Sequence, residues 1–364
     1  MEPARILYPD SLFADEAAVE RVVAGQRAAL QFYSESDPAR IPDTVWRRAQ
    51  GLVTGLTMPI DERVMRRLDS CRIITRMGVG YDLIDTAAAA RRGIAVCNVP
   101  DYGTNEVADH AIALLLGFTR GIVRYNDSVR SDAATGWDYL KAPSVVRLAG
   151  KTLGIIGLGR IGTATALRAK AFGLSVQAYD PYLPDGQELA LGVQRIAGLK
   201  PLLGGVDFLS IHCPLTPETR GLIDGEAVAA MKKGLVLINT ARGPICDLKA
   251  LHAGLRSGQL GAVGLDVLPS EPPPADHPLI KAWRDGAEWL AGRLIITPHA
   301  AFYSPAGMKF LREKALLTVV DYLSTGVLRN CVNRERLRVP KPARRPRPIS
   351  RPAPRAVRRP RTKA

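Results

Sequence analysis

The chain has 364 residues, 46% of them hydrophobic and 23% charged, which is the composition of a globular protein large enough for two domains. Its formal net charge of +15 would suggest a nucleic-acid-binding protein if the charge were evenly spread. Residues 336–364, however, contain 12 Lys and Arg, seven Pro and no acidic residue. The remaining chain has 38 basic and 35 acidic residues, so its fold and function have to be inferred without this basic tail.

The sequence does not indicate a secreted, membrane-spanning or zinc-binding protein. The first 30 residues carry repeated charges and no apolar stretch of signal-peptide length. The longest strongly apolar stretch, Ala111–Phe118, is too short to cross a bilayer. The five cysteines are scattered without C-x-x-C spacing, which predicts neither a disulfide framework nor a metal site. We therefore expect a soluble protein of a reducing compartment, the cytoplasm.

Short apolar runs alternate with helical patterns through the first hundred residues. Such a run between turn residues is typical of a buried strand in a parallel sheet. Helical patterns at 61–69 and 85–92 separate the later runs, and this alternation predicts a first parallel sheet. The predicted strands lie at 5–9, 51–55, 72–78 and 94–100.

Residues 105–130 have the pattern of one long, largely apolar helix, and a second β–α series begins at Thr152. A last amphipathic helix is predicted at 309–324. The sequence thus predicts an α/β fold with two domains, each built on a parallel sheet. The strands of the second series are predicted at 152–157, 175–180, 208–213, 235–240, 261–267 and 294–299.

A glycine motif, Gly-Leu-Gly-Arg-Ile-Gly, follows the first strand of the second series and opens a helix. Gly157 allows a tight turn, Gly159 lets the backbone approach a pyrophosphate, and Gly162 allows close packing of the helix. The next strand ends in Asp180, which can accept hydrogen bonds from a ribose. A glycine-rich turn alone is weak evidence, but strand, helix and acid together predict NAD(H). A 2′-phosphate would be repelled by the carboxylate, which disfavours NADP(H).

Polar side chains follow the later strands of the second series. In an open α/β sheet, ligands bind beyond the carboxyl ends of the strands. Arg242, Glu271 and His299 each lie at or just beyond such an end. One cation, one carboxylate and one imidazole are therefore expected at the same edge of the sheet.

These three side chains suit hydride transfer to a 2-keto acid. A guanidinium such as Arg242 can bind a carboxylate and polarise a carbonyl. Histidine can deliver a proton, and a neighbouring carboxylate favours its charged form. Taken singly, Arg242 could be a surface arginine, Glu271 a solvated loop acid, and His299 a helix-capping or core histidine. Only their joint arrangement favours a catalytic site.

Several stretches resemble the D-isomer-specific 2-hydroxyacid dehydrogenases, which include phosphoglycerate dehydrogenase and glyoxylate/hydroxypyruvate reductase. RMGVGYDLID, GIAVCNVP, LGIIGLGRIG, NTARG and LRNCVN look most similar to the C-terminal-binding-protein branch of that family. The resemblance implies a Rossmann-type NAD-binding domain at 101–302, inserted in a flavodoxin-like substrate domain formed by 1–100 and 303–333. Residues 334–364 lie beyond the match and are expected to be a disordered basic tail.

The resemblance also implies roles for single residues. Arg242 and Glu271 match the catalytic pair of the family, and His299 matches its proton donor. Phe302 stands where many relatives have Trp, so the apolar wall remains without the indole N–H donor, which puts the substrate preference in question. Arg76, Val79 and Gly80 match the loop that binds the substrate carboxylate. The residues that match cofactor contacts, besides the three glycines, are Arg160, Ile161, Asp180, Cys213, Thr219, Thr240, Ala241 and Asp266.

The leading hypothesis is an NAD-dependent dehydrogenase or reductase of 2-hydroxy or 2-keto acids. The alternative is an NAD(H)-sensing scaffold like the animal corepressors of the C-terminal-binding-protein branch. The family resemblance implies a homodimer formed through residues 107–150. The basic tail predicts, at most, sequence-independent binding to nucleic-acid phosphates, since it has no aromatic residue for base stacking.

Overall fold

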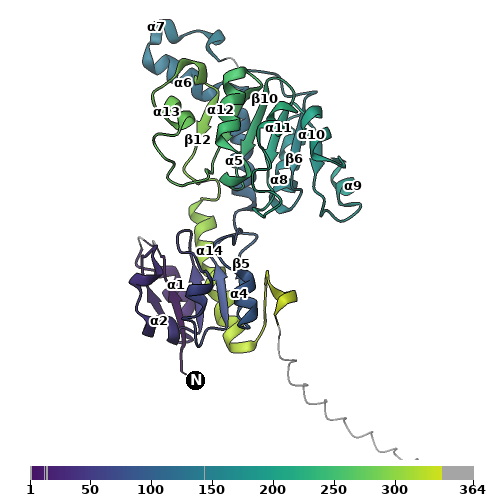
Figure 1. Cartoon of the computed structure of the whole chain (residues 1–364). Helices are drawn as coiled ribbons and strands as arrows, with labels where there is room; N and C mark the ends of the chain where they lie inside the picture. The colour runs from purple at the N-terminus through teal and green to yellow at the C-terminus, as the bar shows by residue number, and fades with distance from the viewer. Residues whose placement is uncertain (1, 12, 14, 143, 338–364) are drawn as a thin grey trace, which may run out of the picture.

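The computed structural model describes residues 2–11, 13, 15–142 and 144–337, which form two lobes (Figure 1). The first lobe holds the N-terminus and helix α14 (Pro305–Thr325), and the second lobe holds the middle of the chain. The disordered tail is predicted at 334–364. Residues 338–364 lie outside the described residues, and the short 3-10 helix at Arg334–Arg336 does not fit the predicted disorder. None of the described helices combines the length and apolar character needed to cross a membrane.

The first lobe is built on a parallel sheet with the strand order β2-β1-β3-β4-β5. This is the order found in flavodoxin. Every residue of the three strands β3, β4 and β5 is buried, as expected where both faces of a parallel sheet are covered. The strands are β1 (Ala4–Tyr8), β2 (Ala28–Phe32), β3 (Gly51–Thr54), β4 (Ile73–Arg76) and β5 (Ala95–Asn98).

The second lobe is built on a parallel sheet with the order β12-β11-β10-β9-β6-β7-β8. The chain runs outward from β6 to β8 and then returns to the other side of β6, which is the Rossmann topology. The two parallel sheets confirm the predicted fold class. The strands are β6 (Thr152–Ile156), β7 (Ser175–Tyr179), β8 (Gln194–Arg195), β9 (Phe208–Ile211), β10 (Leu235–Asn239), β11 (Leu260–Leu265) and β12 (Leu294–Ile296).

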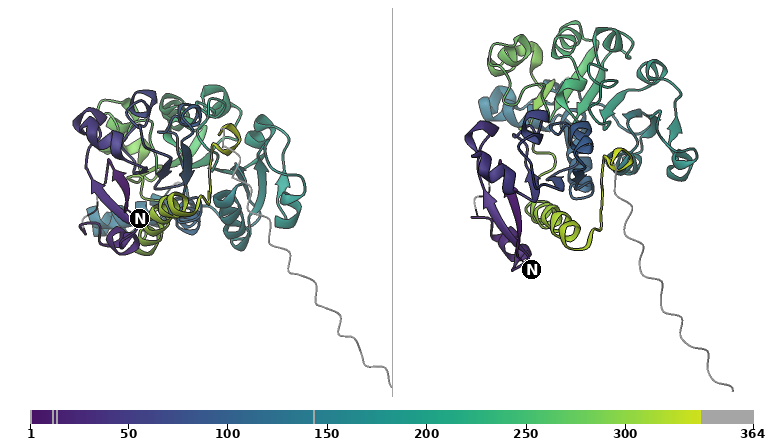
Figure 2. Two further views of the ribbon diagram at one scale, coloured as in Figure 1. Left: turned by 90° about the horizontal axis from the view of Figure 1, so that it is seen from below. Right: turned by 60° about the horizontal axis from the view of Figure 1, so that its bottom comes forward.

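The chain passes between the lobes twice. After β5 it enters the second lobe as α5 (Thr104–Thr119), which packs against α8 (Arg160–Ala171) and β10. It returns as α14, which packs on α1 (Ala18–Ala24), β3 and β4. Figure 2 shows the yellow-green α14 beside the purple N-terminal strands. The first lobe is therefore assembled from segments at both ends of the described chain.

Aspartates immediately before several helices accept hydrogen bonds from the first free backbone N–H groups. Asp61, Asp85, Asp224 and Asp247 cap four helices in this way, and each cap contributes about 1 kcal/mol. The remaining α-helices are α2 (Asp43–Arg48), α3 (Glu62–Met65), α4 (Thr86–Arg91), α6 (Ile122–Ser131), α7 (Ala133–Gly136), α9 (Gln187–Leu191), α10 (Leu199–Gly205), α11 (Gly225–Ala229), α12 (Leu248–Ser257) and α13 (Pro278–Arg284). Short 3-10 helices lie at Pro38–Arg40, Tyr139–Lys141, Gly243–Ile245, Glu288–Leu290 and Arg334–Arg336.

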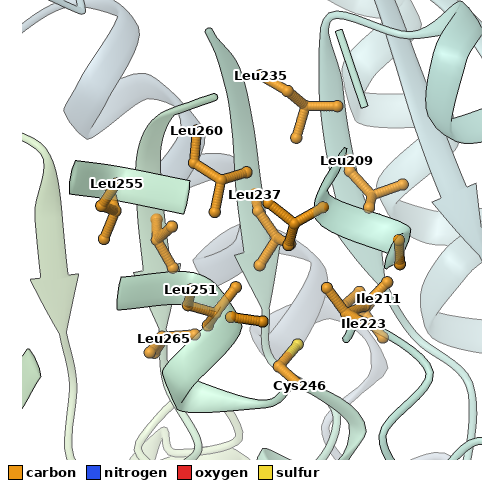
Figure 3. Close-up of a cluster of buried hydrophobic side chains, with 14 of the residues drawn as sticks. Leu209, Ile211, Ile223, Leu235, Leu237, Cys246, Leu251, Leu255, Leu260 and Leu265 are labelled. Carbon is orange, nitrogen blue, oxygen red and sulfur yellow. The ribbon is translucent and has the colours of Figure 1, made fainter. Parts of the chain in front are cut away.

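Leucine side chains form the core between the second sheet and α12 (Figure 3). Leu209 and Leu237 come from neighbouring strands, and Leu251 and Leu255 are four residues apart on one face of α12. All four are completely buried, and each burial stabilises the fold by about 1.5–3 kcal/mol. This core fixes the strands whose carboxyl ends carry the polar residues singled out from the sequence.

The predicted long helix at 105–130 is wrong, because the chain forms two helices there. The first helix, α5, ends at Thr119, and Gly121 adopts a left-handed conformation with φ +66° before α6 begins. A side chain at Gly121 would lie 2.6 Å from Cβ of Ala142, so the break also lets a later loop pack against the chain. Strands β2 and β8, both at sheet edges, are missing from the prediction.

Candidate active site

The glycine motif connects β6 to α8 and lies against the end of β9. Gly157 has φ +89°, and a side chain there would lie 2.7 Å from the backbone nitrogen of Cys213. A side chain on Gly162 would overlap the carbonyl oxygen of Gly157, so the close approach of α8 requires glycine. Gly159, in contrast, is exposed and has open space at its Cβ position. The loop is closed toward the protein and open where a pyrophosphate would approach the helix N-terminus.

Asp180 follows β7 and is hydrogen-bonded to the glycine motif. Its Oδ2 accepts a hydrogen bond of 2.9 Å from the N–H of Leu158, and its Oδ1 accepts one of 3.0 Å from the N–H of Tyr182. A carboxylate has about four lone-pair sites, so acceptor capacity remains. The carboxylate is thus fixed beside the loop with room to accept hydrogen bonds from ribose hydroxyls.

Thr240 provides the test of whether a nucleotide fits this edge of the sheet. It lies after β10, is 8% exposed, and within the described chain its Oγ1 has no hydrogen-bond partner. A buried hydroxyl without a partner costs about 1–3 kcal/mol, so a ligand that supplied a hydrogen-bond partner to Thr240 would recover this amount. The open face of Gly159, the fixed carboxylate of Asp180 and this hydroxyl together fit a dinucleotide.

Three other predicted cofactor residues lie around the same edge. Arg160 is exposed and Ile161 is half-buried in the first turn of α8. Cys213 follows β9, and burial raises the pKa of its thiol to about 11, so the thiol stays protonated at neutral pH. Its role there is to fill space beside Gly157 rather than to react.

Two more predicted cofactor residues use their polar groups within the protein. Thr219 Oγ1 donates a hydrogen bond of 2.6 Å to the carbonyl of Pro214 and accepts one from the N–H of Thr216. The N–H of Ala241 donates a hydrogen bond of 3.0 Å to Oδ1 of Asn239. These bonds shape the loops after β9 and β10, and they leave the Thr219 side chain a structural role.

Arg76 ends β4 and supplies a buried positive charge. It is 7% exposed, and burial lowers the pKa of its guanidinium to about 10, which still leaves it charged at neutral pH. The charge of Arg242 also lowers the pKa of Arg76, so the two guanidinium groups are close enough to repel each other. A pair of neighbouring cations of this kind favours an anionic ligand.

The loop after β4 presents free backbone donors near these cations. Among the described residues, neither the N–H of Val79 nor that of Gly80 has a hydrogen-bond acceptor. The carbonyl of Val79 accepts a hydrogen bond of 2.6 Å from Nδ2 of Asn98, which holds the loop against β5. A side chain on Gly80 would overlap Nη2 of Arg242. The loop is therefore fixed in place with two N–H groups available for a carboxylate.

Arg242 is held by its own loop and by the first lobe. Its Nη1 donates a hydrogen bond of 2.8 Å to the carbonyl of Ala241, and its Nε donates one of 2.9 Å to Oδ1 of Asp82. Asn239 Nδ2 donates a hydrogen bond of 2.9 Å to the Arg242 carbonyl. Burial alone would raise the pKa of Asp82, but the charge of Arg242 and the hydrogen bond from its Nε lower this pKa overall. The ion pair between Arg242 and Asp82 thus joins the loop after β10 in the second lobe to the predicted substrate loop of the first lobe.

Glu271 and His299 form a second charged pair. Oε2 of Glu271 lies 2.7 Å from Nδ1 of His299, and its Oε1 accepts a hydrogen bond of 2.9 Å from the N–H of Leu268. Burial alone would raise the pKa of Glu271, but the bonds from His299 and Leu268 and the charge of Arg242 lower it overall. Glu271 is therefore ionised at neutral pH, and it engages Nδ1 of the imidazole while Nε2 stays available.

Asp266 organises the turn that carries His299. His299 has φ +52°, which is uncommon outside glycine, and its N–H donates a hydrogen bond of 2.8 Å to the Asp266 carbonyl. The Asp266 side chain is buried and accepts bonds of 2.6 Å from Thr297 Oγ1, 2.9 Å from the N–H of Ala300 and 3.0 Å from the N–H of Ala301. The predicted cofactor residue Asp266 thus positions the imidazole.

Two aromatic rings lie beside the cluster formed by Arg76, Arg242, Glu271 and His299. The ring of Phe302 lies 6.0 Å from that of His299 and 6.2 Å from that of Tyr102, edge-on in both cases. Burial raises the pKa of Tyr102, and the charges of Arg76 and Arg242 partly offset this rise. Tyr102 therefore lies beside Phe302 and near both guanidinium groups.

Sequence reasoning missed four residues that shape the site. Asp82 and Asn98 lie within stretches that resemble the family, and their positions beside the substrate loop could have singled them out. Tyr102 lies in a loop without any motif, and only the folded structure brings it to the site. His110 of α5 was interpreted only as part of a helical pattern, but its Nε2 lies 3.0 Å from Thr297 Oγ1, on the turn that carries His299.

His212, beside Cys213, is a structural histidine and makes stability depend on pH. Burial lowers its pKa from 6.5 to about 4, and its Nε2 lies 2.8 Å from Ser210 Oγ. The unfolded chain therefore binds the proton at higher pH than the folded protein. The stability that His212 contributes is complete above pH 6.5 and is lost as the pH falls toward about 4. We expect a loss of up to about 3 kcal/mol over this interval.

Urea denaturation at about pH 7 and about pH 5 measures this effect. A His212→Gln variant should show a smaller decrease in the free energy of unfolding than the wild type. Equal decreases in the two proteins would show that other groups cause the acid sensitivity.

The chain is similar to a known protein family and to known enzymes. A model of the family "D-isomer specific 2-hydroxyacid dehydrogenase, NAD binding domain" matches residues 112–301. A glyoxylate reductase of Korarchaeum cryptofilum is 37% identical over 80% of this chain and 85% of its own length. A D-3-phosphoglycerate dehydrogenase of Mycobacterium leprae is 36% identical over 80% of this chain, and the match spans only 52% of that longer protein.

A solved structure is similar across both lobes. The D-lactate dehydrogenase of Aquifex aeolicus, crystallised with NAD and lactic acid, superposes with a TM-score of 0.76 at 27% identity. The superposition covers 88% of this chain and 95% of the other. These matches confirm the family resemblance and the NAD cofactor inferred from the sequence. The chain belongs to the D-isomer-specific 2-hydroxyacid dehydrogenases, a family of NAD-dependent oxidoreductases.

Proposed function

We propose that this protein interconverts a D-2-hydroxy acid and its 2-keto acid, with Arg242, Glu271 and His299 as the catalytic residues. The observation that carries the proposal is the 2.7 Å contact between Glu271 and Nδ1 of His299, which leaves Nε2 available in a cluster that holds two guanidinium groups. A proton donor beside paired cations suits a substrate whose carboxylate adjoins a carbonyl.

The glycine motif, Asp180 and Thr240 would hold the cofactor, with Arg160, Ile161, Cys213 and Ala241 lining the same edge. Bound NADH would supply the hydride that reduces the keto carbon, and NAD would accept it in the reverse direction. Asp180 would orient the adenine ribose, and the unpartnered hydroxyl of Thr240 would gain a hydrogen-bond partner.

The residues of this chain would bind the substrate and move one proton. Arg76 and the N–H groups of Val79 and Gly80 would hold the substrate carboxylate, while Arg242 would polarise the adjacent carbonyl. His299 Nε2 would donate its proton to the carbonyl oxygen during reduction and take it back during oxidation. Glu271 would stabilise the protonated imidazole and fix its orientation. Phe302 would form the apolar wall against the substrate side chain.

The direct test is oxidation of NADH with a panel of 2-keto acids: glyoxylate, hydroxypyruvate, phenylpyruvate and 4-methylthio-2-oxobutyrate. We expect turnover with at least one of them, and the reverse reaction with only the D-isomer of the product. Tight NADH binding without turnover on any of them would contradict the proposal. It would favour the NAD(H)-sensing scaffold that the C-terminal-binding-protein resemblance suggests.

Asp180 should set the preference between the two nicotinamide cofactors. An Asp180→Asn variant keeps an acceptor for the N–H of Leu158 but loses the charge that repels a 2′-phosphate. We expect the ratio of kcat/KM for NADPH to that for NADH to rise about tenfold or more, since one lost charge interaction of about 1.4 kcal/mol has this effect. Initial rates with both cofactors measure the ratio. An unchanged ratio would place the ribose away from Asp180.

We further propose that the lobes are functional domains, with the substrate domain at 1–100 and 303–333 and the NAD-binding domain at 101–302. The packing of α14 on α1, β3 and β4 supports this division. The basic tail would begin after Leu337, because Arg334–Arg336 form a 3-10 helix and Leu337 packs against the core of the first lobe. Any nucleic-acid binding through the tail stays a prediction.

A homodimer through the region 107–150 is proposed on the basis of exposed apolar side chains. Trp137, Tyr139 and Leu140 are 80%, 82% and 75% exposed, and Ile122 on the neighbouring α6 is 60% exposed. An apolar patch of this kind typically marks a protein–protein interface. Sedimentation velocity should give twice the mass of one chain, and a monomer at micromolar concentration would contradict the proposal.

A further inference from the structure

Two cysteines face each other where the end of the described chain meets the first sheet. Cys97 lies in β5, the edge strand, and Cys331 lies in the segment that follows α14. The two residues are directly paired in an antiparallel bridge, although 233 residues separate them in the chain. Neither thiol belongs to the proposed catalytic site.

The backbone hydrogen bonds show which kind of pair this is. The N–H of Asn98 donates to the carbonyl of Asn330 at 3.3 Å, and the N–H of Val332 donates to the carbonyl of Val96 at 2.8 Å. These bonds flank the two cysteines, which therefore form a non-hydrogen-bonded pair. In such pairs the Cα atoms are about 4.5 Å apart and the side chains are close. This separation lies within the range that a disulfide spans, about 4.4–6.8 Å.

Further contacts hold the segment in this register without any covalent bond. Asn333 accepts a hydrogen bond of 2.9 Å from the N–H of Val96 and donates one of 3.0 Å to the carbonyl of Ile94. Asn333 is itself 2% exposed. Bond formation between the sulfurs would therefore need no rearrangement of the backbone.

The two thiols differ in access and in acidity. Cys97 is completely buried, whereas Cys331 is partly exposed. The adjacent Cys97 thiol lowers the pKa of Cys331 to about 7, and the charge of Arg334 contributes to this lowering. The neighbouring Cys331 thiol and, to a smaller extent, burial raise the pKa of Cys97. This asymmetry gives one accessible thiolate and one resolving thiol beside it.

We propose that Cys97 and Cys331 are a reversible thiol-oxidation site that closes to a disulfide when the protein meets a hydroperoxide. The Cys331 thiolate attacks the O–O bond of hydrogen peroxide and becomes a sulfenic acid, and the released hydroxide takes up a proton to form water. The Cys97 sulfur then attacks the sulfenic sulfur, the S–O bond breaks, and the leaving hydroxide takes the Cys97 proton to form a second water. Two thiols are oxidised and one peroxide is reduced, and a dithiol reverses the step.

The remaining cysteines are poorer candidates for the same reaction. Burial raises the pKa of Cys71 to about 12 and that of Cys213 to about 11, and it raises the pKa of Cys246 as well. Cys213 and Cys246 lie near each other in the core of the second lobe, so they are the competing pair. Neither has a lowered pKa.

The test uses the full chain, treated with hydrogen peroxide, alkylated in denaturant and analysed by mass spectrometry. We expect three alkylated thiols of the five after oxidation, a mass loss of two hydrogen atoms, and one cross-linked peptide pair that contains Cys97 and Cys331. A dithiol should restore five alkylated thiols. Five alkylated thiols after peroxide, a Cys213–Cys246 link, or oxygen added to Cys331 without a link would each overturn the proposal.

A variant pair separates this site from general oxidation. Cys331→Ser should abolish the cross-link, and the control Cys71→Ser should retain it. The disulfide joins β5 to the C-terminal segment, so we expect the thermal midpoint to rise by several degrees on oxidation of the wild type and of Cys71→Ser. Cys331→Ser should show no such rise. The cross-link and the thermal midpoint do not depend on turnover, so this test is independent of the proposed catalytic function.

Discussion

A His299→Asn variant should lose about 10²- to 10⁴-fold in kcat while its Kd for NADH stays within about twofold of the wild type. Asparagine cannot deliver the proton, yet it tolerates the left-handed backbone that His299 adopts at φ +52°. The turn held by Asp266 should therefore survive the change. Steady-state kinetics with the best keto acid of the panel, together with NADH titration by fluorescence, measure both quantities.

Two further variants sharpen this test. His252→Asn, on α12 away from the cluster, is the matched control and should leave kcat unchanged. Glu271→Gln removes the carboxylate that contacts Nδ1 of His299, so kcat should fall while the Kd for NADH is retained. If His299→Asn loses NADH affinity as much as it loses turnover, the imidazole supports the structure and does not serve as proton donor.

The interior strands of both sheets are predictable because their burial leaves a continuous apolar run in the sequence. All residues of β4 and β10 are buried, and both strands are recognisable from their amino-acid sequences alone. Strand β2 escapes this reasoning because its burial alternates at the edge of the sheet, and β8 has only two residues. The helix ends before Gly121 because this glycine adopts a left-handed conformation, and the helical pattern of the sequence does not reveal that conformation.

The second-lobe part of the site is predictable for a related reason. Arg242, Glu271 and His299 all follow parallel strands, whose carboxyl ends meet at one edge. Asp82 and Tyr102 could not be found this way, because they reach the cluster only when the first lobe packs against the second. No local pattern encodes that approach. The ion pair between Asp82 and Arg242, at 2.9 Å, is a property of the assembled chain.

A Gly80→Ala variant should lower kcat/KM about 10²-fold, the size of effect that a displacement of about 1 Å in a catalytic group produces. The new methyl group would overlap Nη2 of Arg242, which is the far end of a flexible side chain. The guanidinium can therefore move aside at little cost in stability. It cannot do so and also keep its place beside the substrate carbonyl.

Stability measurements distinguish this displacement from general damage. The thermal midpoint of Gly80→Ala should match that of Gly225→Ala, a control position where a side chain meets open space. Gly243→Ala should behave differently, since its methyl group would overlap the backbone of Leu268 and destabilise the fold. If Gly80→Ala keeps full activity, the guanidinium of Arg242 is not required where the structure places it. Loss of activity at an unchanged thermal midpoint would instead show that the absence of a side chain at Gly80 is needed to position Arg242.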